Sequence, residues 1–245
     1  MILKAKVYIK NPAEAPQGAK VGRGARGGLY YESTEREHFT EEVSQIEQKI
    51  KETMKFTPEE EHIADNLIKV YTPVANREFR KVRSVIDGQI SYRVKNKYSI
   101  LEKTKRKGIT ANQLRDIFGM RIEVNNVDDV YESVKKLQSI YGNKIIRQED
   151  AIKTPRGLYR SYHIDVQHAP GIYSEIQIRT PLMDKIANAS HILLYKNTKE
   201  LNPQIKQNIE DTLMIYSNIA VNQARPEDLH ELPETQKLLS EFGLK

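Results

Sequence analysis

The sequence predicts an α+β fold, with a mixed, mostly antiparallel sheet of about five strands flanked by N- and C-terminal helices. Two observations lead to this prediction. Apolar and polar residues alternate with a period of two in three segments between residues 118 and 179. Apolar residues also recur every three or four positions, as in an amphipathic helix, before, between and after these segments.

Composition limits the possible classes of protein. The chain has 245 residues, 38% of them hydrophobic and none of them cysteine, which excludes disulfides, thiolate zinc sites and cysteine nucleophiles. No apolar run is long enough to span a membrane, and charges interrupt the first residues before a signal-peptide core can form, so we expect a cytoplasmic protein without membrane contact. The net charge of +6 favours an anionic partner such as a nucleotide or RNA.

Residues 1–35 are expected to be a flexible, basic, glycine-rich segment. Pro12 and Pro16 fall within residues 11–34, and residues 19–28 show no apolar periodicity, so we interpret residues 11–34 as a loop or mobile arm. Gly22, Gly24 and Gly27 have the G-x-G-x-x-G spacing, but no strand-helix-strand unit surrounds them, so we reject a dinucleotide site. The G-K-[ST] residues that end a P-loop motif are also absent, so we reject a P-loop.

Helices are predicted over residues 36–90. Residues 36–56 place five apolar side chains on one helical stripe: Phe39, Val43, Ile46, Ile50 and Met54. A second helix opens with Thr57 as N-cap, Pro58 at its first position and Glu60 closing a capping box. A third helix is predicted from about residue 74 to residue 86. We interpret these helices as scaffold.

The sheet begins beyond Gly88. Residues 118–124 alternate as a half-buried strand, and a helix follows over residues 127–140. Two further strands, at residues 161–166 and 172–179, are separated by a short turn sequence and are therefore expected to be antiparallel. Thr180 and Pro181 then start one helix, and Pro203 precedes another.

Two strands carry an unusual set of polar groups on the side opposite the core. Strand parity places together Tyr159, Ser161 and His163 on one strand and Glu175, Gln177 and Arg179 on the other. An ordinary solvated face is the simpler interpretation for either strand alone. The chemical variety of the set argues against it, because such faces usually repeat Lys, Glu and Thr.

A cationic cluster precedes the first clear strand. It contains Arg93, Lys95, Lys97, Lys103, Lys105, Arg106 and Lys107. The lysines from 105 onward could simply be the charged end of an exposed helix, whereas Arg93 and Lys95 alternate along the edge of a strand. Such a cluster would bind polyphosphate. Asp116 follows it, and with Glu175 could hold Mg²⁺ against phosphate oxygens.

Five motifs in this order resemble the synthetase domain of RelA/SpoT-type alarmone synthetases, which has a nucleotidyltransferase-like fold. The motifs are R-V-K-x-x-Y-S-I-x-x-K from Arg93, D-x-x-G-x-R from Asp116, E-D-A-I-K-T-P-R-G-L-Y-R-S-Y-H from Glu149, E-I-Q-I-R-T from Glu175, and H-I-L-L-Y-K from His191 to Lys196. The resemblance implies transfer of pyrophosphate from ATP to the 3′-hydroxyl of GTP or GDP, with release of AMP.

The same resemblance implies roles for individual residues. Asp116 and Glu175 would be catalytic and would bind Mg²⁺, with Glu175 either assisting the metal or removing the 3′-hydroxyl proton. The ATP-binding residues would be Arg93, Lys95, Ser99, Lys103 and Arg121. The acceptor-binding residues would be Lys153, Arg156, Tyr159, Ser161, His163, Gln177 and Arg179, with Tyr159 stacking on guanine.

The chain also departs from the family pattern. Tyr92 replaces a glycine before the first arginine, and Gly157-Leu158 replaces Asn-Gly before the stacking tyrosine, so we expect a differently shaped acceptor loop. Residues 1–90 show no histidine-aspartate pair of the hydrolase type. The resemblance thus implies a synthesis-only member, with its synthetase-like domain at residues 91–197 and a C-terminal helical region at 198–245.

Alternatives of different classes stay open from the sequence. One is toxin-type pyrophosphorylation of the 3′-end of tRNA or of adenine nucleotides, and another is a catalytically silent nucleotide- or RNA-binding module. The apolar pattern of Leu229, Leu232, Leu238 and Leu239 fits either a homo-oligomer interface or a docked tail helix.

Overall fold

The computed structural model describes three short strands at residues 6–9, 21–23 and 29–32, and residues 55–196, 202–226, 229 and 233–244. The chain forms two compact units, Met1–Pro58 and Glu59–Lys245. Most of the helix predicted at residues 36–56 lies outside the described residues, as do the side chains of Lys196 and Leu232. The four expected segments of the chain stay predictions.

In the first unit, strands β1 (Lys6–Ile9), β2 (Val21–Arg23) and β3 (Leu29–Glu32) form an antiparallel sheet in the order β1-β3-β2. The prediction of a loop at residues 11–34 is therefore wrong for β2 and β3. Aromatic residues favour a strand at Leu29–Glu32. A strand of three or four residues is, however, too short to show a clear period.

The second unit contains the five-stranded sheet. Its strands are β4 (Gln89–Val94), β5 (Phe118–Glu123), β6 (Ile145–Asp150), β7 (Tyr162–Ala169) and β8 (Ile172–Arg179). Their order is β4-β5-β8-β7-β6, and only the central pair, β5 and β8, is parallel. The predicted α+β class, the mixed sheet and the antiparallel hairpin of β7 and β8 are confirmed.

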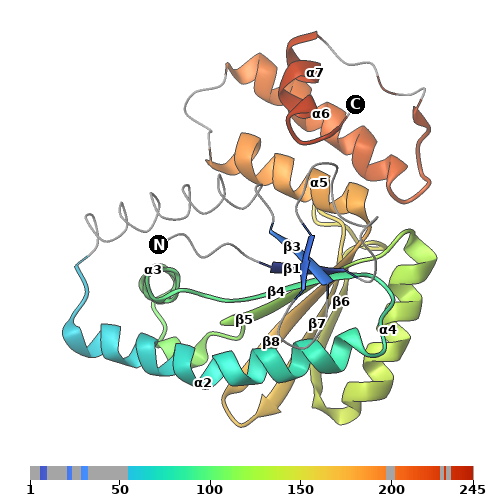
Figure 1. Cartoon of the computed structure of the whole chain (residues 1–245). Coiled ribbons are helices and arrows are strands. Elements are labelled where there is room, and N and C mark those ends of the chain that lie inside the picture. The colour runs from blue at the N-terminus through green and yellow to red at the C-terminus, as the bar shows by residue number, and fades with distance from the viewer. Residues whose placement is uncertain are drawn as a thin grey trace. The chain divides into compact units, whose positions relative to one another are not determined.

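Helices surround this sheet (Figure 1). They are α2 (Pro58–Arg83), α3 (Lys97–Lys107), α4 (Val127–Tyr141), α5 (Pro181–Ser190), a π-helical turn η4 (His191–Lys196), α6 (Pro203–Ile219) and α7 (Pro233–Ser240), with short 3₁₀ turns η2 (Ala111–Gln113) and η3 (Gly142–Lys144). No helix in the described part of the chain combines the length and the apolar character needed to cross a membrane.

Helices α2 and α4 cover one face of the sheet (Figure 1). Tyr71 of α2 is fully buried, and its hydroxyl donates to the carbonyl of Gly171 at 3.2 Å and accepts from the amide of Tyr173 at 3.1 Å. The core beneath the helices includes Phe118, Ile122, Ile164, Ile176 and Ile178, all fully buried.

The prediction of separate second and third helices is wrong, because α2 runs without interruption through Pro73. An interior proline removes one backbone hydrogen bond and usually kinks or ends a helix. Here Tyr71, Val74 and Ala75 on either side of Pro73 are buried. We infer that the packing of these three residues outweighs the lost hydrogen bond.

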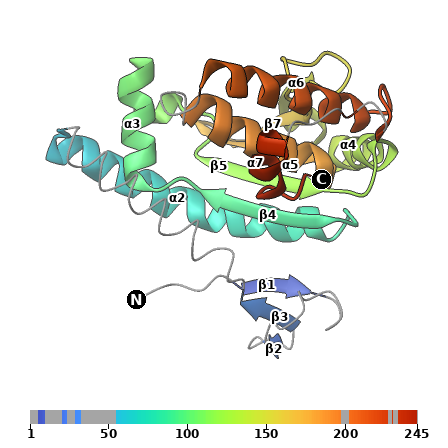
Figure 2. The same ribbon diagram turned by 90° about the horizontal axis from the view of Figure 1, so that it is seen from above.

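Helices α5, α6 and α7 group together at another side of the second unit (Figure 2). They share a second hydrophobic cluster, which also receives Leu158 from the loop between β6 and β7. The buried members of the cluster are Leu158, Ile186, Ala189, Leu193, Leu194, Ile209, Leu213, Tyr216, Leu239 and Leu244. Leu239 therefore belongs to a docked tail helix.

Candidate active site

The register of the five strands builds a polar surface opposite the face that α2 and α4 cover. Residues paired across a ladder point to the same side of a sheet. One row across the sheet is Arg93, Gly119, Glu175, Asp165 and Arg147. The next row is Ser91, Arg121, Gln177, His163 and Glu149. Sequence parity thus predicted correctly that Glu175, Gln177 and His163 share a face.

Asp116 lies two residues before the start of β5, where two lysines converge on its carboxylate. Lys95, just past the edge strand β4, places Nζ 3.0 Å from Oδ2 of Asp116, and Lys103 of α3 forms a hydrogen bond to the same oxygen. Burial by itself would raise the pKa of Asp116, but the two ammonium groups hold this pKa below its ordinary value. Asp116 is therefore an anion at neutral pH.

Local sequence fixes where Lys103 lies. The side chain of Asn96 caps α3 by accepting a hydrogen bond from the backbone N–H of Ser99 at 2.8 Å. Gly108 ends the helix in the left-handed conformation, with φ of 62°. Lys103 therefore lies about two turns beyond the cap.

The second lysine, Lys95, is largely buried. Burial lowers the pKa of Lys95, although the charge of Asp116 opposes that shift.

Glu175 of β8 is the second carboxylate of the site. The amide of Gln177 donates to its Oε2 at 2.7 Å, and Nδ1 of His163 lies 3.4 Å from its Oε1. Burial alone would raise the pKa of Glu175, but contact with His163 and Gln177 holds this pKa at about 2. The charge of Asp116 acts on Glu175 in the raising direction, which is consistent with the proximity of the two carboxylates.

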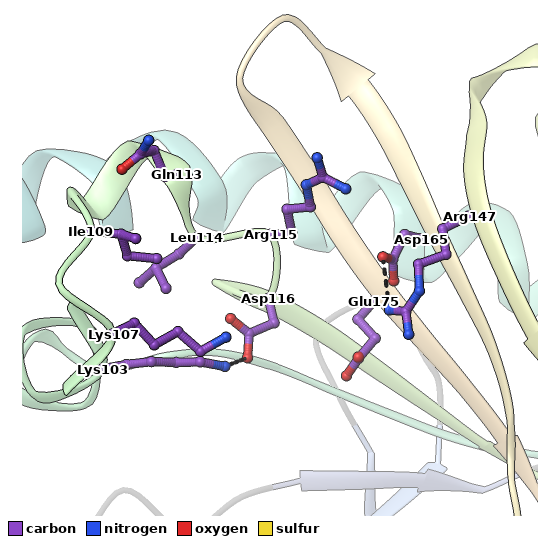
Figure 3. Close-up of a pocket in the computed structure, with 10 residues that line it drawn as sticks. All are labelled: Lys103, Lys107, Ile109, Gln113, Leu114, Arg115, Asp116, Arg147, Asp165 and Glu175. Carbon is purple, nitrogen blue, oxygen red and sulfur yellow. Dashed lines mark hydrogen bonds and ion pairs between the residues drawn. The ribbon is translucent and has the colours of Figure 1, made fainter. Parts of the chain in front are cut away.

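A cavity of about 370 Å³ brings these two carboxylates together (Figure 3). Asp116 and Glu175 both line it, with Lys103 and Lys107 on one side and the Arg147–Asp165 ion pair (3.3 Å) on another. The remaining lining residues are Ile109, Gln113, Leu114 and Arg115. The cavity thus presents acidic and basic groups to the same space, as a metal and polyphosphate site requires.

A second cluster surrounds Tyr159, which precedes β7. The hydroxyl of Tyr159 lies 2.7 Å from Nε2 of His163 and accepts a hydrogen bond from Arg179. Arg179 is buried and also donates to Gln177 at 2.7 Å and to Asp184 of α5 at 3.1 Å. Arg121 reaches the same Asp184 oxygen at 2.9 Å. The ring of Tyr159 is thereby fixed from its hydroxyl end.

Other residues predicted for the site do not line the cavity. Lys153 and Arg156 are exposed on the loop before β7, with Nζ of Lys153 over the ring of Tyr131 and Arg156 paired with Glu149 at 2.7 Å. Arg93 is exposed on β4 and Ser99 is half-buried in the first turn of α3. Ser161 is fully buried.

Sequence reasoning missed several residues of the surface. Asp165 shares the parity of His163, so alternation along β7 was a sufficient signal for it. Arg147 gave no such signal, because Ile145 and Ile146 begin β6 without alternation. Gln113 and Arg115 reach the cavity from the turn η2 and the loop after it, which no period describes. Lys107, named above in the cationic cluster, reaches it from the end of α3.

Comparison with known proteins agrees with this geometry. Residues 92–200 match the family described as "Region found in RelA / SpoT proteins". The chain is 34% identical to the guanosine-3′,5′-bis(diphosphate) 3′-pyrophosphohydrolase of Aquifex aeolicus, over 62% of this chain and 21% of that protein. It is 31% identical to the GTP pyrophosphokinase YwaC of Bacillus subtilis, over 50% of this chain and 65% of YwaC. The chain therefore spans about a fifth of the long Aquifex relative and about two thirds of the short Bacillus one.

Solved structures are similar over a larger share of their own length. Small alarmone synthetase 1 of Bacillus subtilis bound to its product pppGpp has a TM-score of 0.53 and 27% identity, covering 64% of this chain and 93% of the synthetase. A GTP pyrophosphokinase family protein of Streptococcus pneumoniae has a TM-score of 0.55 and 28% identity, covering 78% of this chain and all of that one. Residues 92–200 thus match a region found in RelA/SpoT proteins, and the chain has the fold of the small alarmone synthetases.

Proposed function

We propose that the chain is an ATP-dependent pyrophosphokinase that transfers the β,γ-diphosphate of ATP to the 3′-hydroxyl of GDP or GTP. The observation that carries the proposal is the meeting of Asp116 and Glu175 at one cavity beside Lys95 and Lys103. The names of the relatives support it, since YwaC is a GTP pyrophosphokinase and small alarmone synthetase 1 binds pppGpp as its product.

The two carboxylates fit a Mg²⁺ ion. Magnesium in nucleotide sites typically takes one or two carboxylates and fills its other positions with phosphate oxygens and water. Asp116 and Glu175 supply that number, and no group of three or more acidic, histidine or cysteine ligands occurs among the described residues. When bound, Mg²⁺ would neutralise charge on the donor phosphates.

The cationic residues would hold ATP. Lys95 and Lys103 share one carboxylate oxygen of Asp116, so their ammonium groups can exchange this contact for phosphate oxygens. Arg93 and Arg121 extend the positive surface along β4 and β5, and Ser99 offers a hydroxyl at the start of α3. In the reaction the 3′-hydroxyl oxygen forms a bond to the β-phosphorus, and the bond from the β-phosphorus to the oxygen that bridges it to the α-phosphorus breaks. AMP leaves with that bridging oxygen, and the hydroxyl proton passes to water.

The acceptor would bind on the side of β7 and β8. The ring of Tyr159 would stack on guanine, while His163, Gln177 and Arg179 would contact its ribose or phosphates. Ser161 would support Tyr159 from a buried position, and Lys153 and Arg156 would reach acceptor phosphates from the exposed loop.

The role of Glu175 follows from its pKa. A carboxyl group with a pKa of about 2 is ionised throughout the physiological range, which favours a ligand for a cation. A general base works best with a pKa near the operating pH, so Glu175 would be a weak acceptor for the 3′-hydroxyl proton. Its place beside Asp116 on the cavity, together with this anionic state, leads us to assign metal binding as its main role.

Label transfer from γ-labelled ATP tests the proposed function. The purified chain is incubated with Mg²⁺ and, in separate reactions, with GDP, GTP, ATP or deacylated tRNA. We expect label on GDP and GTP, with AMP formed in equal amount. Label on tRNA or ATP alone would replace the guanine acceptor by one of the two alternatives, and label on no acceptor would favour a silent binding module.

A further inference from the structure

Successive side chains near the end of the loop between β6 and β7 point in opposite directions, one to the polar surface and its two neighbours into the protein. The ends of this loop are joined by the backbone hydrogen bond from Ala151 N–H to the carbonyl of Ser161 at 3.0 Å. Near its C-terminal end, Tyr159 turns towards His163 and Arg179 on the polar surface. Leu158 and Arg160, on either side of Tyr159, instead turn into the protein and are 8% and 5% exposed.

Both flanking residues are held by the C-terminal helices. Leu158 packs into the hydrophobic cluster that α5, α6 and α7 share. The guanidinium of Arg160 lies against the end of α6, where Nε donates to Ser217 Oγ at 3.0 Å and Nη2 to Asn218 Oδ1 at 3.0 Å. Nη2 also lies 3.5 Å from Gln223 Oε1.

Arg160 also holds its own loop. Its Nη1 donates to the carbonyl of Ile152 at 2.8 Å, eight residues earlier in the chain. One guanidinium therefore joins the beginning of the loop, the end of the loop and the end of α6. A planar group with donors on all three nitrogens can make these contacts together, whereas the single nitrogen of lysine cannot.

Burying the charged guanidinium of Arg160 in this way is energetically unfavourable, which is unexpected for a residue with only a structural role. Each hydrogen bond recorded for Arg160 goes to a neutral oxygen, and no carboxylate of the described residues forms a salt bridge with it. Burial lowers the pKa of Arg160, and no neighbouring charge offsets this shift. Buried cations without a carboxylate are unfavourable compared with apolar residues of similar size.

We propose that Arg160 is a positioning residue that fixes the acceptor loop, and with it the ring of Tyr159, against the end of α6. This inference rests on the proposed function, because it assigns to α6 a part in acceptor binding. Through Arg160 the end of α6, and through Leu158 the hydrophobic cluster of α5, α6 and α7, form the support on which the acceptor side of the site is built. The residues proposed to bind ATP, on and beside α3, β4 and β5, make none of these contacts with Arg160.

Two variants and a matched control test the proposal in the full chain. Arg160→Lys keeps the charge but not the three-way contact, and Asn218→Ala removes one partner on α6. We expect the KM for the acceptor nucleotide to rise about tenfold in Arg160→Lys and less in Asn218→Ala, the size expected when hydrogen bonds to a charged group are lost. The KM for ATP should change less than about twofold. Gln207→Ala, an exposed change on the same helix, should leave both values unchanged.

Limited digestion with trypsin provides a readout that does not depend on activity. Cleavage after Lys153 and Arg156 in the exposed loop should be faster in Arg160→Lys than in the wild type, and this variant leaves the number of trypsin sites unchanged. Equal cleavage rates with an unchanged acceptor KM would overturn the proposal. A parallel rise of both KM values with a lower Tm would also overturn it, by showing a general structural role. If the wild type labels no acceptor, the proposed function has failed, and the cleavage rates alone decide whether Arg160 holds the loop.

Discussion

The replacement Asp116→Asn separates binding of ATP from transfer. Asp116 is 23% exposed, and its partners Lys95 and Lys103 are 15% and 19% exposed. Two unit charges 3.0 Å apart attract by about 5.5 kcal/mol at an effective dielectric constant of about 20. Desolvation cancels much of this attraction, so we expect a net loss of about 1–3 kcal/mol in the free energy of unfolding.

Turnover should fall much further than stability. Loss of a carboxylate that holds Mg²⁺ removes several kcal/mol of transition-state stabilisation, so kcat should decrease by about 10³ or more. Binding of ATP should persist or become tighter, because Lys95 and Lys103 lose a competing anion and stay free to contact phosphate. The variant should thus bind the donor without transferring its diphosphate.

Three measurements check this prediction. Steady-state kinetics with labelled ATP gives kcat, calorimetry with a non-hydrolysable ATP analogue gives the Kd, and urea unfolding gives the stability. Asp128→Asn, an exposed change in the first turn of α4, is the control and should leave kcat unchanged. Turnover of Asp116→Asn within tenfold of the wild type would refute the reasoning, as would a loss of ATP affinity as large as the loss of kcat.

Three further outcomes are expected. Lys95→Gln should raise the KM for ATP about tenfold and leave the KM for the acceptor unchanged. A raised acceptor KM with an unchanged KM for ATP would contradict the assignment of Lys95 to ATP binding. Tyr159→Ala should weaken acceptor binding by about 1–3 kcal/mol, whereas Tyr159→Phe, which keeps the ring, should cost less; equal losses would argue against stacking. Burial lowers the pKa of His168 to about 4 although Glu78 opposes it, so the unfolded chain binds the extra proton between about pH 6.5 and pH 4. The free energy of unfolding should therefore fall as the pH drops through that window, by about 3 kcal/mol at most, and a slope that His168→Asn leaves unchanged would contradict this assignment.

Strand parity explains why so much of the polar surface could be predicted from the sequence. Glu175, Gln177 and His163 alternate with buried isoleucines, so their shared face follows from a local pattern. The edge strand at Arg93 was predicted on the same grounds. The convergence of Asp116 and Glu175 depends on the parallel pairing of β5 with β8, which no local pattern predicts. Their pairing was suggested by the chemistry of two carboxylates beside a cationic cluster and by the family resemblance.

Features set by tertiary contacts could not be predicted. Arg160 lies in the same motif as Tyr159, but its partners Ser217 and Asn218 are more than fifty residues away in the sequence. Two separate helices were predicted where α2 runs without interruption through Pro73, and burial of the residues that flank Pro73 keeps α2 continuous. Both outcomes depend on which surfaces meet, and local periodicity carries no information about that.

Binding of Mn²⁺, a stand-in for Mg²⁺ that is visible by electron paramagnetic resonance, tests most directly whether Asp116 and Glu175 hold one ion. The titration is done with a non-hydrolysable ATP analogue at saturating concentration in the wild type, Asp116→Asn and Glu175→Gln. We predict one tightly bound Mn²⁺ per wild-type chain and a large loss of affinity in each variant, with the analogue still bound. Mn²⁺ binding of equal affinity in all three proteins would contradict the account.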